Sequence, residues 1–310
     1  MSKILAVFGA TGQQGGGIIN YILNDPELSK QYKIRAITRD VNTDKAKKLK
    51  EDVDVVQGDV LDKATLEGAL DDVHTVFAMT TPFFGPDAVE NEYNAGKTIA
   101  DVAVQKKIPY LIFSTLPSVS EISGGKFTAV TPFDAKAKIE QYIRQLPIKS
   151  AFYSPGFFME NFASQPFLGP KKAPDGTWTL YRSTSSKALV PYIDAVGDSG
   201  KFVGAILANF EKYKGKTFCA AQAFYTMEDI VEILSKTTGR KIVYKQISRE
   251  EFKKTLPFAP DLFDEGFAVL NESGYWGNDS EKLVAWALEN ARGRLTTLEE
   301  YLTIHPVQLG

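Results

Sequence analysis

The chain of 310 residues is 44% apolar and 24% charged, which allows a sizeable core in one large domain or two fused domains. A net charge of −2 provides no basic surface, so we expect no direct binding of nucleic acid. With Cys219 as the only cysteine and His74 and His305 as the only histidines, an internal disulfide is excluded, and we expect neither a metal site nor a Ser-His-Asp triad.

The first predicted strand, residues 4–8, leads into glycines at positions 9, 12 and 15 and then into an apolar helical stretch. This order is typical of a dinucleotide-binding loop, in which Gly9 permits the turn, Gly12 lets the backbone approach a pyrophosphate and Gly15 allows close helix packing. The alternative is a glycine-rich turn without a ligand. The residues of this loop that we expect to contact a cofactor are Gly9, Thr11, Gly12, Gln13, Gln14 and Gly15.

The second predicted strand, residues 34–38, ends at Arg39 and Asp40. At this position an arginine accommodates the 2′-phosphate of NADP, whereas an acid binds the 2′-hydroxyl of NAD. Arg39 therefore favours NADP(H), and Asp40 keeps NAD(H) open. The alternative is that both belong to a solvated charged loop.

Two further strand ends carry candidate cofactor residues. After the strand over 53–57, Asp59 is expected to bind the adenine amino group and Val60 to pack on the ring, although Asp59 is equally suited to a turn or a helix cap. After the strand over 75–79, Thr80 and Thr81, with Met79, are expected near the second ribose, because ligands bind at the carboxyl ends of parallel strands.

The first half of the chain alternates strands with helices, which predicts an α/β fold with a Rossmann-type, doubly wound parallel sheet. The remaining strands are predicted over 110–114 and 150–154, and the helices over 16–23, 44–50, 63–69, 89–106 and 132–145.

The second half has prolines, dense aromatic residues and a Gly/Ser/Lys-rich stretch over 169–187 that favours irregular structure. We expect a smaller, mostly helical domain over 155–310 after a dinucleotide-binding domain over 1–154, with later segments returning to the first. The predicted elements are helices over 198–210, 226–237 and 298–304, strands over 217–221 and 242–246, and an irregular, mobile segment over 256–279.

Four segments together resemble the NmrA-like branch of the atypical short-chain dehydrogenase/reductase superfamily. They are Gly9-Ala10-Thr11-Gly12-Gln13-Gln14-Gly15, Thr38-Arg39, Val56-Gln57-Gly58-Asp59 and Pro155-Gly156-Phe157-Phe158-Met159-Glu160-Asn161-Phe162. The resemblance covers nearly the whole chain and implies NAD(P) in a cleft between a Rossmann domain and a smaller one. Known members include a fungal regulator that sequesters a transcription factor and an NADPH sensor, and related branches include quinone reductases.

The superfamily couples a tyrosine to a lysine in a Tyr-x-x-x-Lys motif. Here Lys136 matches the lysine, but Pro132 stands at the tyrosine position and cannot donate a proton. Lys136 is thus the candidate catalytic and ribose-binding residue, with a solvated surface lysine as the alternative. Pro155 and Phe157 are expected beside the nicotinamide, unless this aromatic cluster is only core.

These features lead us to expect an NADP(H)-binding protein that senses its cofactor or holds a regulatory protein partner, with weak or no turnover. The alternative is an NADPH-dependent reductase of a small carbonyl, quinone or aromatic substrate that uses Lys136. No apolar run approaches the ~20 residues of a membrane span, and the strand at Ile4 leaves no room for a leader. We therefore expect a cytoplasmic monomer or homodimer without a membrane partner, with the nucleus left open as a second location.

Overall fold

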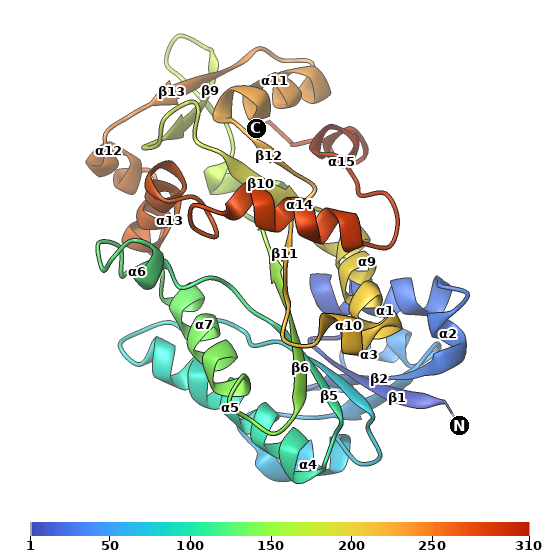
Figure 1. Ribbon diagram of the computed structural model, residues 1–310. Helices are drawn as coiled ribbons and strands as arrows, with labels where there is room; N and C mark the ends of the chain where they lie inside the picture. The colour runs from blue at the N-terminus through green and yellow to red at the C-terminus, as the bar shows by residue number, and fades with distance from the viewer. Residues whose placement is uncertain (1, 310) are drawn as a thin grey trace.

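Seven parallel strands form the central sheet of the protein, whose computed structural model describes residues 2–309 (Figure 1). Their order is β11-β6-β5-β4-β1-β2-β3, so the direction of winding reverses between β1 and β4. The carboxyl ends of the strands on the two sides of such a reversal diverge and leave room for a ligand. The predicted α/β fold with a Rossmann-type sheet is confirmed.

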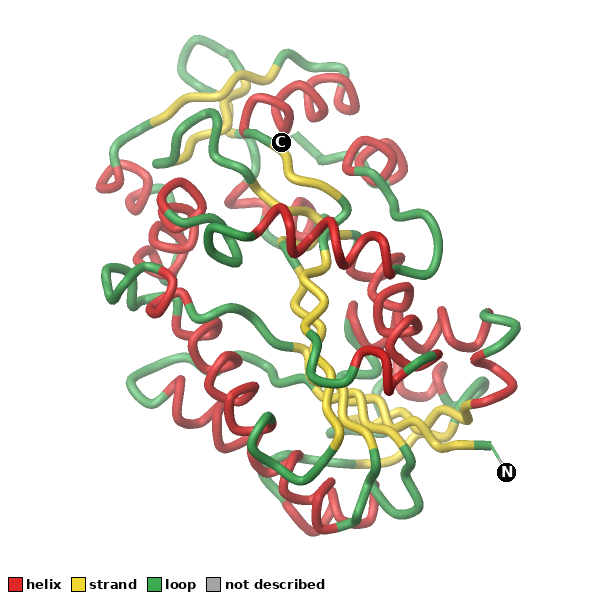
Figure 2. The backbone as a smooth tube through the Cα atoms, in the orientation of Figure 1, coloured by secondary structure: helices red, strands yellow, loops and turns green. Residues whose placement is uncertain are grey.

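The strands and helices alternate through the first half of the chain (Figure 2). The strands are β1 (Lys3–Phe8), β2 (Tyr32–Thr38), β3 (Asp54–Gln57), β4 (Thr75–Ala78), β5 (Tyr110–Ser114), β6 (Lys149–Pro155), β7 (Phe157–Phe158), β8 (Lys171–Lys172), β9 (Trp178–Arg182), β10 (Val190–Ile193), β11 (Thr217–Ala220), β12 (Ala223–Tyr225) and β13 (Ile242–Gln246). The helices are α1 (Gln13–Asn24), α2 (Leu28–Gln31), α3 (Asp44–Leu49), α4 (Lys63–Ala69), α5 (Ala88–Gln105), α6 (Val119–Ile122), α7 (Thr131–Ile143), α8 (Asn161–Ser164), α9 (Ala195–Ala208), α10 (Phe210–Tyr213), α11 (Met227–Thr238), α12 (Arg249–Lys254), α13 (Pro260–Glu272), α14 (Ser280–Asn290) and α15 (Leu298–Ile304), with a 3-10 turn at Pro166–Leu168. None of the helices within residues 2–309 combines the length and apolar character needed to cross a bilayer.

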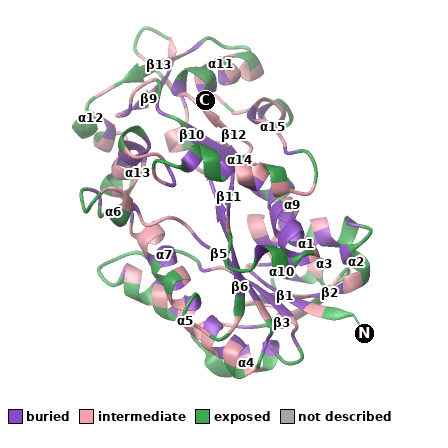
Figure 3. Cartoon of the chain, viewed as in Figure 1, coloured by how far each residue is buried: buried purple, intermediate pink, exposed green. Residues whose placement is uncertain are grey.

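Helices cover both faces of the sheet, and its central strands are largely buried, whereas the edge strand β3 is not (Figure 3). Alternate residues of a strand point to opposite faces. In β1, Leu5 and Val7 pack under α1 and α9, whereas Ala6 and Phe8 face the core formed with α4, α5 and α7. This two-sided burial explains why the predicted strands are continuous apolar runs.

Small residues let α1 and α9 pack very closely. A side chain at Gly17 would overlap the backbone of Val196, and one at Gly200 or Gly204 would overlap the Tyr21 ring or its Cβ. Both α9 and β11 follow residue 155, so the second half of the chain returns to complete the sheet and its cover.

The smaller C-terminal region combines helices with two three-stranded sheets, β12-β10-β7 and β13-β9-β8. Two expectations about it are wrong. The stretch over 169–187 contains the regular strand β9, which pairs along its length with β13. The segment over 256–279, expected to be irregular, contains α13, a helix of 13 residues whose Pro260 stands in its first turn, where a missing N–H costs nothing.

Because α1 and α9 cross so closely, adding a single methyl group at their contact should destabilise the protein. Gly200→Ala should lower the free energy of unfolding by about 1–3 kcal/mol, the usual cost of overpacking, because the new Cβ overlaps Tyr21. Gly68→Ala, on an open face of α4, is the matched control and should be neutral or stabilise by about 0.5–1 kcal/mol. Urea denaturation of both variants measures the difference, and equal stabilities would contradict this account of the crossing.

Candidate functional site

A cleft of about 400 Å3 lies at the carboxyl ends of β1 to β4, where the sheet reverses its winding. It is lined by eleven of the residues expected from the sequence to contact a cofactor: Gly9, Thr11, Gly12, Gln13, Gln14, Arg39, Asp59, Val60, Met79, Thr80 and Thr81. Three further lining residues belong to the segments that carry the family resemblance: Thr38, Gly58 and Phe158. The sequence analysis did not single out the remaining five: Phe8, Ile37, Leu61, Phe83 and Ala95. Most of these directly adjoin the predicted strand ends, so position in the sheet could have identified them.

The glycine turn between β1 and α1 forms one wall of the cleft. Gly9 has φ +64° in the left-handed region, and its carbonyl accepts a 2.9 Å hydrogen bond from Gly12 N–H. Gly15 does not line the cleft. A side chain there would overlap the Gly9 carbonyl, so Gly15 allows close packing of the helix, although it also stood among the residues expected to contact a cofactor.

The amino end of α1 fits a bound pyrophosphate. Gly12 precedes the helix, has ordinary extended backbone angles and is exposed, so the turn itself does not demand a glycine there. Within the described residues, α1 has neither a capping side chain nor an acidic residue in its first turn. The backbone N–H groups and the positive dipole end are therefore directed at the cleft, as an anionic group requires.

The end of β2 presents Arg39, not Asp40, to the cleft. Arg39 is exposed and makes no ion pair with any residue that the structure describes. The Asp40 carboxylate accepts a 2.8 Å hydrogen bond from Asn42 N–H and closes a turn outside the cleft lining. At the end of β2, the charged group that is free to contact a ligand in the cleft is therefore the positive Arg39.

Asp59 lines the cleft and also closes a turn. One carboxylate oxygen accepts a 2.9 Å hydrogen bond from Leu61 N–H, and the Asp59 N–H donates to the Thr65 hydroxyl at 2.9 Å. The turn alternative recognised in the sequence is therefore present in the structure, and the contact of Asp59 with adenine stays a prediction.

The cleft adjoins a second, largely apolar chamber of about 480 Å3, and the two share Gln14, Met79, Thr80 and Phe158. Lys136, Pro155 and Phe157, which we expected among the cofactor residues, line the chamber rather than the cleft. Ser114 lies in its wall, and its hydroxyl donates a 2.7 Å hydrogen bond to the Gln14 amide oxygen. The end of β5 is thereby joined to the glycine turn.

Lys136 is not a solvated surface lysine, because it is only 7% exposed and pairs with Glu92, which is 1% exposed. Its Nζ also lies 3.2 Å from both the carbonyl and the hydroxyl oxygen of Thr80, and that hydroxyl donates to Glu92 at 2.6 Å. A lysine has three donors, and here three acceptors match them. Burial lowers the pKa of Lys136, and the Glu92 carboxylate opposes that shift.

Pro132, at the position of the missing phenol, stands in the chamber wall in the first turn of α7, and among residues 2–309 the tyrosine that lines this chamber is Tyr275. Tyr153 is fully buried beneath α9 and shares a 2.8 Å hydrogen bond with the Ser199 hydroxyl. Tyr275, which the sequence analysis missed, does line the chamber, but its hydroxyl donates to the Pro155 carbonyl at 3.0 Å, and burial raises its pKa. Neither phenol is free to donate a proton.

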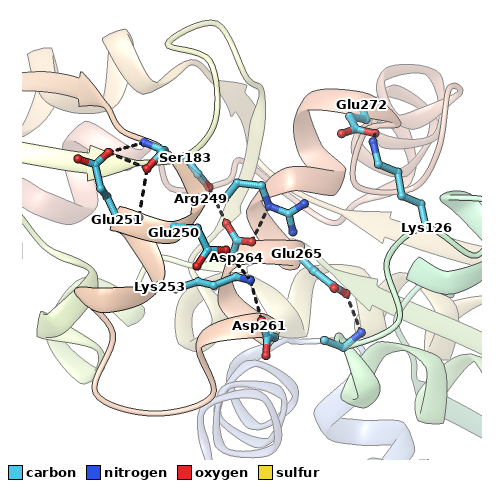
Figure 4. Close-up of polar contacts among 12 residues, drawn as sticks. Lys126, Ser183, Arg249, Glu250, Glu251, Lys253, Asp261, Asp264, Glu265 and Glu272 are labelled. Atoms are coloured by element: carbon cyan, nitrogen blue, oxygen red, sulfur yellow. Dashed lines mark hydrogen bonds and ion pairs between the residues drawn. The ribbon is translucent and has the colours of Figure 1, made fainter.

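The far wall of the chamber is α13, which ion pairs and hydrogen bonds fasten on both sides (Figure 4). The buried Asp264 carboxylate accepts hydrogen bonds from Ser183 at 2.9 Å and from Arg249 at 2.6 Å. Glu265 accepts from the Ala129 N–H at 2.7 Å, in the segment leading to α7. These contacts hold the apolar face of α13 over the chamber.

Comparisons with known proteins agree with this geometry. The model of the NmrA-like family matches residues 1–302. An NmrA-like family domain-containing protein of Dictyostelium discoideum is 31% identical, with 97% of each chain covered. The NmrA-like family domain-containing oxidoreductase FrzB of Cladobotryum sp is 28% identical over 80% of this chain and 77% of its own.

Solved structures share the fold. The crystal structure of NmrA, a negative transcriptional regulator, in complex with NADP superposes with a TM-score of 0.80 at 23% identity, covering 97% of this chain and 94% of that one. NADPH-dependent quinone oxidoreductase from Escherichia coli, complexed with NADPH, gives a TM-score of 0.76 at 19% identity, covering 97% and 99%.

Gly12 borders the cleft, and a Cβ there would make one tight contact, so this position predicts a variant that folds but does not bind. Gly12→Val should abolish binding of NADPH with little loss of thermal stability, because the nearest atom to the new Cβ is the Gly9 carbonyl oxygen at 3.2 Å while the branched side chain fills the cleft. Gly16→Ala, in the same helix, is the control and should bind as the wild type does. Fluorescence titration with NADPH measures both, and wild-type affinity in Gly12→Val would show that the pyrophosphate site is assigned wrongly.

Proposed function

The chain belongs to the NmrA-like family, and we propose that it binds NADP(H) in the cleft and acts as a cofactor-responsive regulator with little or no turnover. The observation that supports this proposal most directly is that the Lys136 ammonium group already has a hydrogen-bond partner for each of its donors. All three of its donors are matched by Glu92 and Thr80, and no phenol beside it is free, so the chamber lacks a poised proton donor.

The preference for NADP(H) rests on the end of β2. Arg39 lines the cleft without an ion-pair partner among residues 2–309, and a guanidinium binds phosphate by paired, charge-assisted hydrogen bonds. The acid beside it, Asp40, is engaged in its own turn and is not part of the lining. A 2′-phosphate would therefore meet a free positive charge.

Arg39→Ala should remove the preference for NADP(H) and leave NAD(H) affinity nearly unchanged. A charge-assisted hydrogen bond to the phosphate contributes about 1.5–3 kcal/mol, which corresponds to about a ten- to hundredfold difference in Kd. Lys33→Ala, an exposed cation on the same strand, is the control and should keep the preference. Equal wild-type dissociation constants for the two cofactors would refute the role of Arg39.

The loop between β4 and α5 is the segment through which bound cofactor would change the surface of a regulatory protein. Phe83 of this loop lines the cleft, whereas Phe84 lines the chamber and is 71% exposed. Cofactor in the cleft would contact one side of the loop and bias its conformation, which is how a ligand shifts a binding surface. The structurally related NmrA, a negative transcriptional regulator known in complex with NADP, supports a partner of the regulatory kind, met in the cytoplasm or the nucleus.

The second candidate function is reduction of a small carbonyl, quinone or aromatic substrate. The apolar chamber favours it, because it adjoins the cleft at Thr80 and Phe158 and has room for such a molecule. Several relatives are named oxidoreductases. When bound, NADPH supplies a hydride, and the chain itself would then have to orient the acceptor and provide a proton from Lys136.

Turnover decides between the two candidates. We expect NADPH oxidation below about 1 s⁻¹, the low end for ordinary enzymes, across a panel of quinones and carbonyls. A kcat above this value on any of them would favour the reductase.

The role of Lys136 is best tested in the double variant Lys136→Met, Glu92→Gln, because removing the lysine alone leaves a buried, unpaired carboxylate at a cost of about 3–5 kcal/mol. In a regulator the double variant should weaken NADPH binding modestly and change no turnover. In a reductase it should lower kcat by about 10²–10⁴-fold. Lys138→Met, which removes an exposed lysine of the same helix, is the control.

A further inference from the structure

Arg182, at the end of β9, is a buried cation without a counter-ion. It is 7% exposed, and two of its nitrogens donate to the carbonyls of Tyr181 at 2.7 Å and Leu168 at 2.5 Å. Its Nε is buried and has no acceptor, and the guanidinium makes no ion pair within the described part of the chain. Buried charges are ordinarily paired, because an unpaired one loses its hydration without compensation.

The surroundings of Arg182 add positive charge instead of removing it. Burial lowers the pKa of Arg182 to about 10, and the nearby Lys171 has its own pKa lowered by burial and by the Arg182 charge. The buried acid of α13, Asp264, does not pair with Arg182, because its carboxylate is held by Ser183 and Arg249 (Figure 4). Phe267, whose ring centre lies 4.7 Å from the guanidinium carbon, helps to hold the side chain in place.

Arg182 lines a small cavity of about 30 Å3, together with polar side chains of Asn161, Gln165 and Tyr192. A cavity of this size holds one or two small polar groups. Five of its lining residues also line the apolar chamber, so the small cavity adjoins the chamber: Phe157, Asn161, Gln165, Leu168 and Phe267.

We propose that the chamber takes a ligand with a flat apolar body and a terminal carboxylate, and that Arg182 binds the carboxylate in the small cavity. Arginine is the residue best suited to this task, because its planar fork matches a carboxylate and the low-polarity surroundings strengthen the pairing. Asn161 and Gln165 provide amide donors for the remaining carboxylate lone pairs. The inference goes beyond the proposed function, since it concerns a second ligand and does not require the cofactor.

Calorimetric titration with 2-naphthoate and with its uncharged counterpart 2-naphthamide tests the proposal, with and without NADPH. The wild-type protein should bind the carboxylate at least about tenfold more tightly than the amide, the scale of a charge-assisted hydrogen bond. Arg182→Gln should bring this ratio close to one, and Arg182→Lys should retain part of it. Arg240→Gln, an exposed arginine of the same region, should leave the ratio unchanged.

Two outcomes would overturn the proposal. One is equal wild-type affinity for the carboxylate and the amide, which needs no variant and holds even if Arg182→Gln fails to fold. The other is a folded Arg182→Gln protein that keeps the wild-type ratio, as expected if Arg182 only holds β9 against α13. Because NADPH binding is followed separately by its fluorescence, failure here is distinct from failure of the cofactor assignment.

Discussion

The position of α1 between the sheet and α9 depends on two close backbone contacts, one with the glycine turn and one with α9. At its amino end, Gly15 lies against the carbonyl of Gly9. Along its length, Gly17 lies against the backbone of α9. The helix is therefore held against the sheet and against the returning chain at once. Because α1 cannot shift, its free N–H groups stay aimed at the same point of the cleft, which is the preorganisation that tight anion binding requires.

The buried group of Lys136, Glu92 and Thr80 connects three elements. Lys136 comes from α7, Glu92 from α5 and Thr80 from the end of β4, at the border of cleft and chamber. A ligand that engaged the lysine would have to compete with Glu92 or Thr80. In the regulatory role that we propose, such competition would change contacts on α5 and α7 together and so link ligand binding to both helices.

Sequence patterns sufficed for features that depend on local spacing. The strand ends at Arg39 and Thr80 and the start of α11 at Thr226 are examples. Features that depend on distant pairing were missed. The apolar residues of α13 are divided between the chamber and the core, and Gly266 and the flanking prolines obscured its helical period. Likewise, nothing in the neighbourhood of Arg182 in the sequence indicates burial, because the rings that enclose it come from α12 and α13.

The late return of the chain to the sheet also bears on how the protein is made. During synthesis β6 is the edge of an incomplete sheet until β11 emerges, and α1 lacks its cover until α9 follows. Contacts between segments so distant in the sequence form slowly, because a long loop must close first. An unfinished parallel edge next to an uncovered apolar helix face is the kind of surface that chaperones bind. The nascent first half of this chain should therefore depend on such protection on the ribosome until about the time that residue 220 leaves the exit tunnel.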